Sequence, residues 1–249
     1  MKAKKIIYPI HDYGQLSVSI SKGNGKLGNI PQFNLLPTSG VIRNGKGVAL
    51  TNVTGTCGKY AEDCAKVCYA KRCCTLHHNS VIPAWGRNTV LVRLCPDKVR
   101  EGINEYCKKN IVRYFRFHTS GELENLEHLK LYATICHDNP DVTFFIYTKA
   151  FDILQEWFED LQDNGEGIPS NFIINLSEWH GNLDFLKEST AHPYFKHCHI
   201  FSYDDNSPKC RYNHLPHCPA IDVHGHETGI TCAQCRRCMT GHDTAVYSH

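Results

Sequence analysis

The sequence predicts an α/β fold: a complete or partial (β/α) barrel of the TIM type with a cysteine-rich C-terminal tail. Three observations lead to this fold class. Between residues 112 and 204, near-continuous apolar segments of strand length alternate with helical patterns, which is typical of a parallel sheet with helices outside it. The chain lacks a G-x-G-x-x-G segment, which disfavours an open dinucleotide-binding sheet. After residue 205 the alternation stops, and a cysteine- and histidine-rich segment follows.

The elements follow one another in a regular order. Residues 1–31 are polar and glycine-rich, and because their segment GNGKLG lacks the phosphate-loop pattern, we expect a loop there. Apolar spacing predicts two helices between Ser80 and Lys109, with a break at Pro96. Strands are predicted at 32–36, 47–53, 112–118, 141–148, 171–177 and 197–204. Further helices are predicted at 124–137, 151–162 and 183–188.

We divide the chain into a barrel at residues 1–205, with a cysteine-rich insertion at 56–74, and a metal-binding tail at 206–249 that packs on the barrel. The chain has 249 residues and a net charge of +2, so it can bury a full core and has no overall charge that would attract nucleic acid or an anionic membrane. A signal-peptide pattern and a membrane-spanning apolar run are absent, so we expect a cytosolic protein without a membrane partner. In that reducing compartment the 14 cysteines are expected to be metal ligands or free thiols.

A first group of cysteines is spaced C-x6-C-x3-C and comprises Cys57, Cys64 and Cys68. Cys64 and Cys68 are four residues apart and would share one face of a helix, while Cys57 would reach back from the preceding loop. Sulfur ligands at this density select iron–sulfur or zinc centres. Three thiolates either leave one metal position open or are completed by a distant ligand: a tail cysteine, Cys73, Cys74 or Cys210.

A second group lies in the tail, where Cys218, Cys232, Cys235 and Cys238 are spaced C-x13-C-x2-C-x2-C. Cysteines at x2 spacing suit three corners of a [4Fe–4S] cluster, with the fourth ligand arriving from further away. Zinc is the alternative, although a zinc ribbon usually pairs two separate C-x2-C knuckles. Free thiols are the third interpretation. The sequence leaves open whether the chain holds one cluster or two.

Polar residues follow each strand of the alternating region. The first of these strands ends in His118, Thr119, Ser120, Gly121 and Glu122, and the second in Tyr147, Thr148 and Lys149. The later ends carry Ser177, Glu178, Trp179 and His180, and then Ser202, Tyr203, Asp204 and Asp205. Because the carboxyl ends of parallel strands meet at one edge, these groups predict a small-molecule site at the barrel mouth.

The candidate catalytic residues at this mouth are Glu122, Lys149 and His118, and the candidate cofactor-binding residues are Ser120, Gly121 and Glu122. A carboxylate there would suit an ammonium group or a ribose hydroxyl. The alternative is purely structural: Thr119 or Ser120 would cap the next helix, and Glu122 would be an acid of its first turn.

Several segments in order resemble the phage gene-product-88 family: GNGKLGNIPQFNLLP, the cysteine stretch ending in CYA, FRFHTSGEL and FFIYTKA. The resemblance covers residues 20–205, and the tail CPA…TCAQCRRCM resembles that of the cysteine-tailed members. It implies a phage or mobile-element origin, hence a place in the host cytosol, and an iron–sulfur protein.

At the level of the fold the chain is also similar to radical S-adenosylmethionine enzymes. In that comparison Cys57, Cys64 and Cys68 match the ligands of the reactive [4Fe–4S] cluster, and Ser120–Glu122 match the Gly-Gly-Glu turn that holds the methionyl amine. The cysteine spacing departs from the usual C-x3-C-x2-C. This similarity implies S-adenosylmethionine as a second cofactor.

Three functions follow. The first is an iron–sulfur barrel protein with a site at its strand ends, with radical S-adenosylmethionine chemistry as the reaction class. The second is a non-enzymatic binding or regulatory protein that is stabilised by iron–sulfur clusters or zinc. The third, zinc-based nucleic-acid binding, has local support only from Arg236 and Arg237 between the tail cysteines.

Overall fold

The structure is a computed structural model, and it describes residues 16–38, 40–43, 46–47, 49–61, 64–178, 182–204 and 214–247. In these residues a seven-stranded sheet has the order β1-β2-β5-β6-β7-β8-β9. The strands from β2 to β9 run parallel, and β1 pairs with β2 in the antiparallel sense. They are β1 (Ile20–Ser21), β2 (Gln32–Phe33), β5 (Tyr114–Phe117), β6 (Thr143–Thr148), β7 (Phe172–Ser177), β8 (His199–Asp204) and β9 (Thr244–Tyr247).

The predicted α/β class with a parallel sheet is confirmed, but the described strands do not close into a complete barrel. Strands β1 and β9 are the two edges of the sheet. Of the two strands expected ahead of the cysteines, β2 alone joins the sheet. The other expected strand, β4 (Ala49–Val53), pairs instead with β3 (Gly40–Arg43) in a separate antiparallel hairpin. One strand that would be needed to continue the barrel is therefore used elsewhere.

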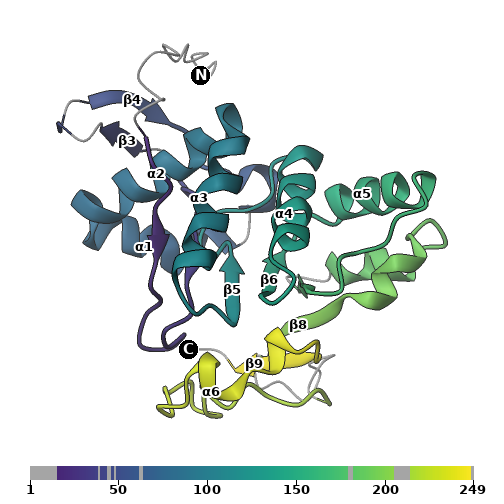
Figure 1. Cartoon of the computed structure of the whole chain (residues 1–249). Coiled ribbons are helices and arrows are strands. Elements are labelled where there is room, and N and C mark those ends of the chain that lie inside the picture. The colour runs from purple at the N-terminus through teal and green to yellow at the C-terminus, as the bar shows by residue number, and fades with distance from the viewer. Residues whose placement is uncertain are drawn as a thin grey trace.

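Helices cover one face of the sheet, as Figure 1 shows. The break expected at Pro96 is confirmed, because α2 (His78–Leu94) ends there and Pro96 opens the first turn of α3 (Pro96–Lys109). The two other covering helices are α4 (Leu126–Asp138) and α5 (Phe151–Asp163). Under them lies an aromatic core, in which the ring of Phe117 stacks on Tyr132 at 4.3 Å and on Phe144 at 5.3 Å between centroids. The helix expected at 183–188 is the 3-10 helix η4 (Asn182–Lys187), followed by η5 (Pro193–His197).

The cysteine-rich tail covers the opposite face of the sheet (Figure 1). Its short helices α6 (Cys232–Cys235) and η6 (Arg237–Met239) precede β9, which adds to the sheet beside β8. Met239 packs on Phe145 and Ile30 in a small apolar cluster of that face. The backbone N–H of Cys232 donates to the Lys26 carbonyl at 2.9 Å, which ties the tail to the glycine-rich segment near the N-terminus. The expected domain boundary at 205 lies outside the described residues.

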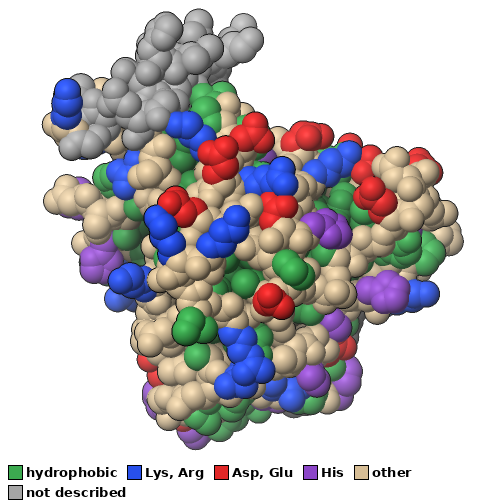
Figure 2. All heavy atoms as spheres, viewed as in Figure 1, with side chains coloured by type: hydrophobic (Ala, Val, Ile, Leu, Met, Phe, Trp, Pro, Cys, Tyr) green, Lys and Arg blue, Asp and Glu red, His purple; other side chains and the backbone are tan. Residues whose placement is uncertain are grey.

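The surface carries both signs of charge. Figure 2 shows basic and acidic side chains interspersed over the face that it presents. No helix in the described ranges is long and apolar enough to cross a membrane.

Two histidines are buried in the core beside α4. The Nε2 of His118 lies 2.7 Å from the hydroxyl of Tyr132, whereas neither ring nitrogen of His128 has a hydrogen-bond partner among the described residues. Burial lowers the pKa of His118 to about 3 and that of His128 to about 4. Both rings are therefore neutral near pH 7.

We expect the free energy of unfolding to fall as the pH drops from about 6.5 toward 4. In that window the unfolded chain binds protons on both histidines and the folded chain does not, so each contributes a slope of about 1.4 kcal/mol per pH unit. In urea titrations at several pH values, His128→Leu should reduce the slope of unfolding free energy against pH by the contribution of one proton. His137→Leu, at an exposed position of the same helix, is the control. An equal slope in His128→Leu and the parent protein would contradict the assignment.

Candidate functional site

The cysteine stretch forms three short elements instead of one helix. Cys57 precedes the 3-10 helix η2 (Gly58–Ala61), and Cys64 opens η3 (Cys64–Lys66). Cys68 is the N-cap of α1 (Tyr69–Leu76) and has an extended backbone. The prediction that Cys64 and Cys68 share one helix face is therefore wrong, because the chain turns between η3 and α1.

The three thiols nevertheless gather beside Glu122 and Lys149, and we call Cys57, Cys64 and Cys68 the strand-end thiol group. Burial raises the pKa of the Cys57 thiol to about 12. The neighbouring charges that add to this effect are those of Glu122, Cys68 and Cys64, and the charge of Lys149 opposes it. Burial also raises the pKa of Cys64, again against the charge of Lys149. These three thiols and the strand-end residues Glu122 and Lys149 thus lie in one region of the structure.

Glu122 lies at the centre of this region with its carboxylate buried and hydrogen-bonded. Oε1 accepts from the Leu123 N–H at 2.9 Å and from the Thr148 hydroxyl at 2.8 Å. Oε2 accepts from the Lys149 N–H at 3.0 Å. Burial raises the pKa of Glu122, although the charge of Lys149 and these hydrogen bonds act in the opposite direction. The carboxylate therefore joins the end of β5 to the end of β6.

The Thr119–Glu122 turn also fixes the start of the cysteine stretch. The Thr56 hydroxyl accepts a hydrogen bond from the Glu122 N–H at 2.9 Å, and the Thr56 N–H donates to Leu36 O at 2.8 Å. Ser120 is buried, and its hydroxyl donates to Leu35 O at 2.9 Å. Thr56 is thereby fixed against the strand-end turn, and Cys57 is the next residue in the chain.

The capping alternative for this turn is wrong. Helix α4 begins at Leu126, and its N-cap is Asn125, whose side chain accepts from the His128 N–H at 3.0 Å. Thr119 and Ser120 are thus too far upstream to cap it, and Glu122 lies outside its first turn. Both Ser120 and Glu122 instead belong to the turn between β5 and the helix.

The structure places the predicted site residues unequally. His118 points into the core, where it contacts Tyr132, so it lies apart from the strand-end thiol group. Lys149 and Thr148 lie at Glu122 as expected. Ser202 is buried within the sheet. Trp179, His180, Asp205 and Cys210 lie outside the described residues.

Two residues that hold the site were missed at the level of the sequence. Thr56 was absent from the candidates although it directly precedes Cys57. Asp152, in the first turn of α5, accepts hydrogen bonds from both Lys59 and Tyr60 of η2. This contact ties the loop between Cys57 and Cys64 to the end of β6. A carboxylate early in a helix is common, so the sequence offered no signal that it had this partner.

The tail thiol group, Cys218, Cys232, Cys235 and Cys238, also gathers in one place. Burial raises the pKa of Cys218, and the charges of Cys238 and Cys235 raise it further. Burial raises the pKa of Cys232 to about 11, again with contributions from Cys218 and Cys238. Cys218 therefore lies near thiols that follow it by at least 14 residues in the chain.

The chemistry of both donor sets fits a soft metal or an iron–sulfur cluster. Four thiols can complete the shell of such a centre, and three leave one position open. All cysteines that the structure describes are free thiols. In the same described part of the chain, no three His, Cys, Asp or Glu side chains are arranged to hold a metal ion as they stand.

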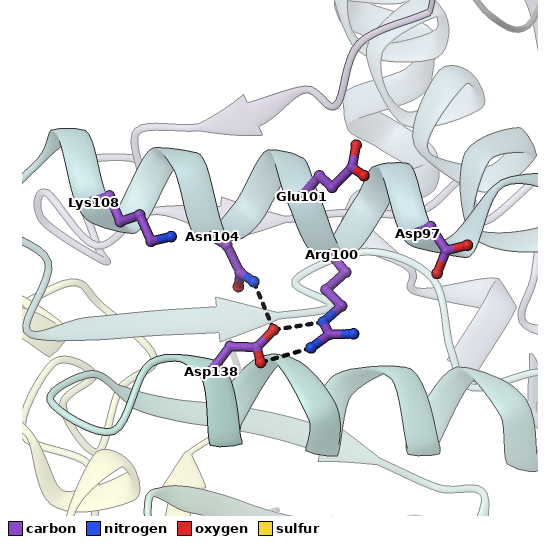
Figure 3. A pocket seen from close by; sticks show the side chains of 6 residues that line it. All are labelled: Asp97, Arg100, Glu101, Asn104, Lys108 and Asp138. Carbon is purple, nitrogen blue, oxygen red and sulfur yellow. Dashed lines mark hydrogen bonds and ion pairs between the residues drawn. The ribbon is translucent and has the colours of Figure 1, made fainter.

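A hollow on the helical side has a different character. It has a volume of about 460 Å³ and lies between α3 and α4 (Figure 3). The Asp138 carboxylate there accepts two bonds from the Arg100 guanidinium and one from the Asn104 amide. Hydrogen bonding from Arg100 holds the pKa of Asp138 down at about 2. These groups satisfy one another and connect two helices, so we assign the hollow a structural role.

Comparison with known proteins gives two matches. The family model described as Gene product 88 matches residues 18–241. The Gene 88 protein of Mycobacterium phage L5 is 24% identical over 211 residues, which cover 78% of this chain and 82% of that protein. No solved structure matches the chain significantly.

We expect Gly121→Ala to destabilise the fold by more than about 2 kcal/mol. Gly121 has φ of +89°, and an added Cβ would lie 2.6 Å from Leu35 Cβ and 2.7 Å from Thr56 Oγ1. Left-handed strain and overpacking each cost about 1–2 kcal/mol or more. Gly167→Ala, where an added Cβ meets nothing within 4 Å, is the control. Equal urea midpoints for the two variants would show that the turn is not tightly packed.

Proposed function

The chain belongs to the Gene product 88 family, whose model matches residues 18–241, and from this premise we propose that it is a phage iron–sulfur protein with a ligand site at its strand ends. The tail thiol group would hold one [4Fe–4S] cluster. The strand-end thiol group would hold a second cluster with one iron open to a ligand. A reducing host cytosol is the compartment in which these thiols stay available.

One observation carries the proposal: the strand-end thiol group shares its location with a buried carboxylate and a lysine. The charges with the largest effects on Cys57 come from Glu122, Cys68, Cys64 and Lys149. The charges of Cys73 and Cys74 are not among those that raise the pKa of Cys57, although the charge of Cys68 raises the pKa of Cys74 as well. This pattern supports a set of three thiols at the strand ends, with one ligand position left for a substrate or cofactor.

Radical S-adenosylmethionine chemistry is the reaction class that we propose for this site. The strands of the sheet follow sequence order and carry their helices on one face, which supports the arrangement of a partial barrel. In such an arrangement Glu122 and Lys149 would bind the ligand at the open iron. When bound, the cluster would supply an electron to the ligand, and the protein residues would orient it.

A second candidate function is non-enzymatic, with both centres serving stability or redox sensing. The hydrogen bonds of Glu122 favour it, because Leu123, Thr148 and Lys149 already engage both carboxylate oxygens. A residue so engaged can serve as a link between strands without binding a ligand. Zinc-based nucleic-acid binding has less support, since the charges in Figure 2 are interspersed.

Metal analysis of the anaerobically purified protein tests the cluster proposal. We expect about eight irons and eight sulfides per chain for two [4Fe–4S] clusters, with a broad visible absorption. Cys64→Ser should lower both values to about four, and Cys235→Ser should remove the other cluster. Cys95→Ser is the control, because Cys95 is the N-cap of α3, a position where serine is favoured. Zinc without sulfide would overturn the proposal.

Ligand binding separates the enzymatic function from the non-enzymatic one. We expect the iron-loaded protein to bind S-adenosylmethionine and Glu122→Gln to bind it at least tenfold more weakly, since the variant loses a carboxylate charge at the ammonium. Glu124→Gln, in an ion pair with Arg93 at 2.6 Å, is the matched control. A fully loaded protein that neither binds nor cleaves S-adenosylmethionine would favour the non-enzymatic function.

A further inference from the structure

Arg116 is a half-buried cation in the middle of β5 on the face that the tail covers. Its neighbours on β5, Phe115 and Phe117, are buried on the helix side of the sheet. Its guanidinium carbon lies 4.4 Å from the centroid of the Tyr147 ring. Its Nε is buried and has no hydrogen-bond partner among the described residues. A half-buried guanidinium loses part of its hydration, and a negative partner would offset that loss.

The tail thiol group lies next to this cation. Arg116 lies over the ring of Tyr147. The hydroxyl of the same tyrosine forms a hydrogen bond with the Cys238 thiol. The amide of Asn175 donates to Cys238 O at 3.1 Å, which fixes the segment against the sheet. Cys232 packs on the same apolar cluster as Phe145, the residue paired with Arg116. Burial raises the pKa of the Cys232 and Cys238 thiols, and the positive charge of Arg116 opposes this rise.

We propose that Arg116 is the half-buried counter-charge of the tail thiol group and that it would stabilise an anionic metal centre held there. The inference rests on the proposed function for the identity of the cluster. A centre with four thiolates carries net negative charge, and one added electron makes it more negative. A nearby positive charge stabilises the reduced form more than the oxidised form. Arg116 is thus a positioning residue that sets the reduction potential of the tail cluster.

The test is a dithionite titration of the full-length, iron-loaded protein in the Cys64→Ser background, which retains all four tail thiols. We expect Arg116→Gln to lower the ratio of reduced to oxidised cluster about tenfold at a fixed potential, equal to about 59 mV for one electron. Arg116→Lys keeps the charge and should restore most of the parent value. Arg113→Gln is the matched control, because Arg113 faces Tyr114 at 5.6 Å instead. An unchanged potential in Arg116→Gln with full iron content would overturn the inference.

Two further measurements keep the inference testable. If Arg116→Gln is insoluble, Tyr147→Phe retains the ring under Arg116 and removes the hydroxyl at Cys238, so a smaller shift in the same direction is expected. No shift would count against the arrangement. If the parent protein holds no iron or sulfide, the proposed function fails on its own. Titration with Co²⁺ then tests the counter-charge alone: Arg116→Gln should bind it about tenfold more weakly than Arg113→Gln, and equal affinities would overturn the inference.

Discussion

A parallel sheet has to be covered on both faces, and in this chain the two covers differ in kind. Helices α3, α4 and α5 bury one face in a large aromatic and aliphatic core. Within the described residues, the cluster on the tail side has three fully buried apolar side chains, Ile30, Phe145 and Met239. This cluster is much smaller than the helix-side core and contributes correspondingly less hydrophobic free energy. Hydrogen bonds from Cys232 and Asn175 help, and a metal centre on the tail thiols would supply the remaining cross-link.

This difference places the two thiol groups in separate surroundings. The tail group lies over the middle of the sheet, beside Arg116 and Tyr147. The strand-end group lies at the carboxyl ends of β5 and β6, where Thr56 and Gly121 bring the cysteine stretch against the turn. The charge of Arg116 also reaches Tyr69, the residue that follows Cys68, where it opposes the rise in pKa that burial causes. The two thiol groups therefore have different surroundings and share Arg116 as one neighbouring cation.

Much of the fold could be predicted because each element between residues 80 and 204 carries its own periodicity. Helix α5 has its apolar residues on one face, and β6 is an apolar strand. The tail was harder to interpret. Strand β9 has four residues among glycines and histidines, and its pairing with β8 depends on contacts distant in sequence. Arg116 likewise gave no signal, because a charged residue alternating with phenylalanines usually indicates a solvent-facing strand side. What covers that side is a tertiary property. Cys218 and the later cysteines, by contrast, were grouped from their spacing, and the charges of Cys235 and Cys238 do act on Cys218. The metal centre that this grouping predicts stays a prediction.

If the chain has the proposed function, the different composition of the two thiol groups indicates different roles for them. When a protein supplies every ligand, the metal centre is closed and acts on folding or on electron storage, whereas a missing ligand leaves a position for chemistry. The tail group has four thiols beside a half-buried cation, which suits a closed, charged centre. The strand-end group has three thiols and Glu122. A carboxylate accepts about four hydrogen bonds, and the described residues supply two to Oε1 and one to Oε2. These three hydrogen bonds hold the carboxylate between the ends of β5 and β6. On the proposed function, an amine at the open metal position would be a further donor to the same carboxylate, so Glu122 would link the strands and bind the ligand.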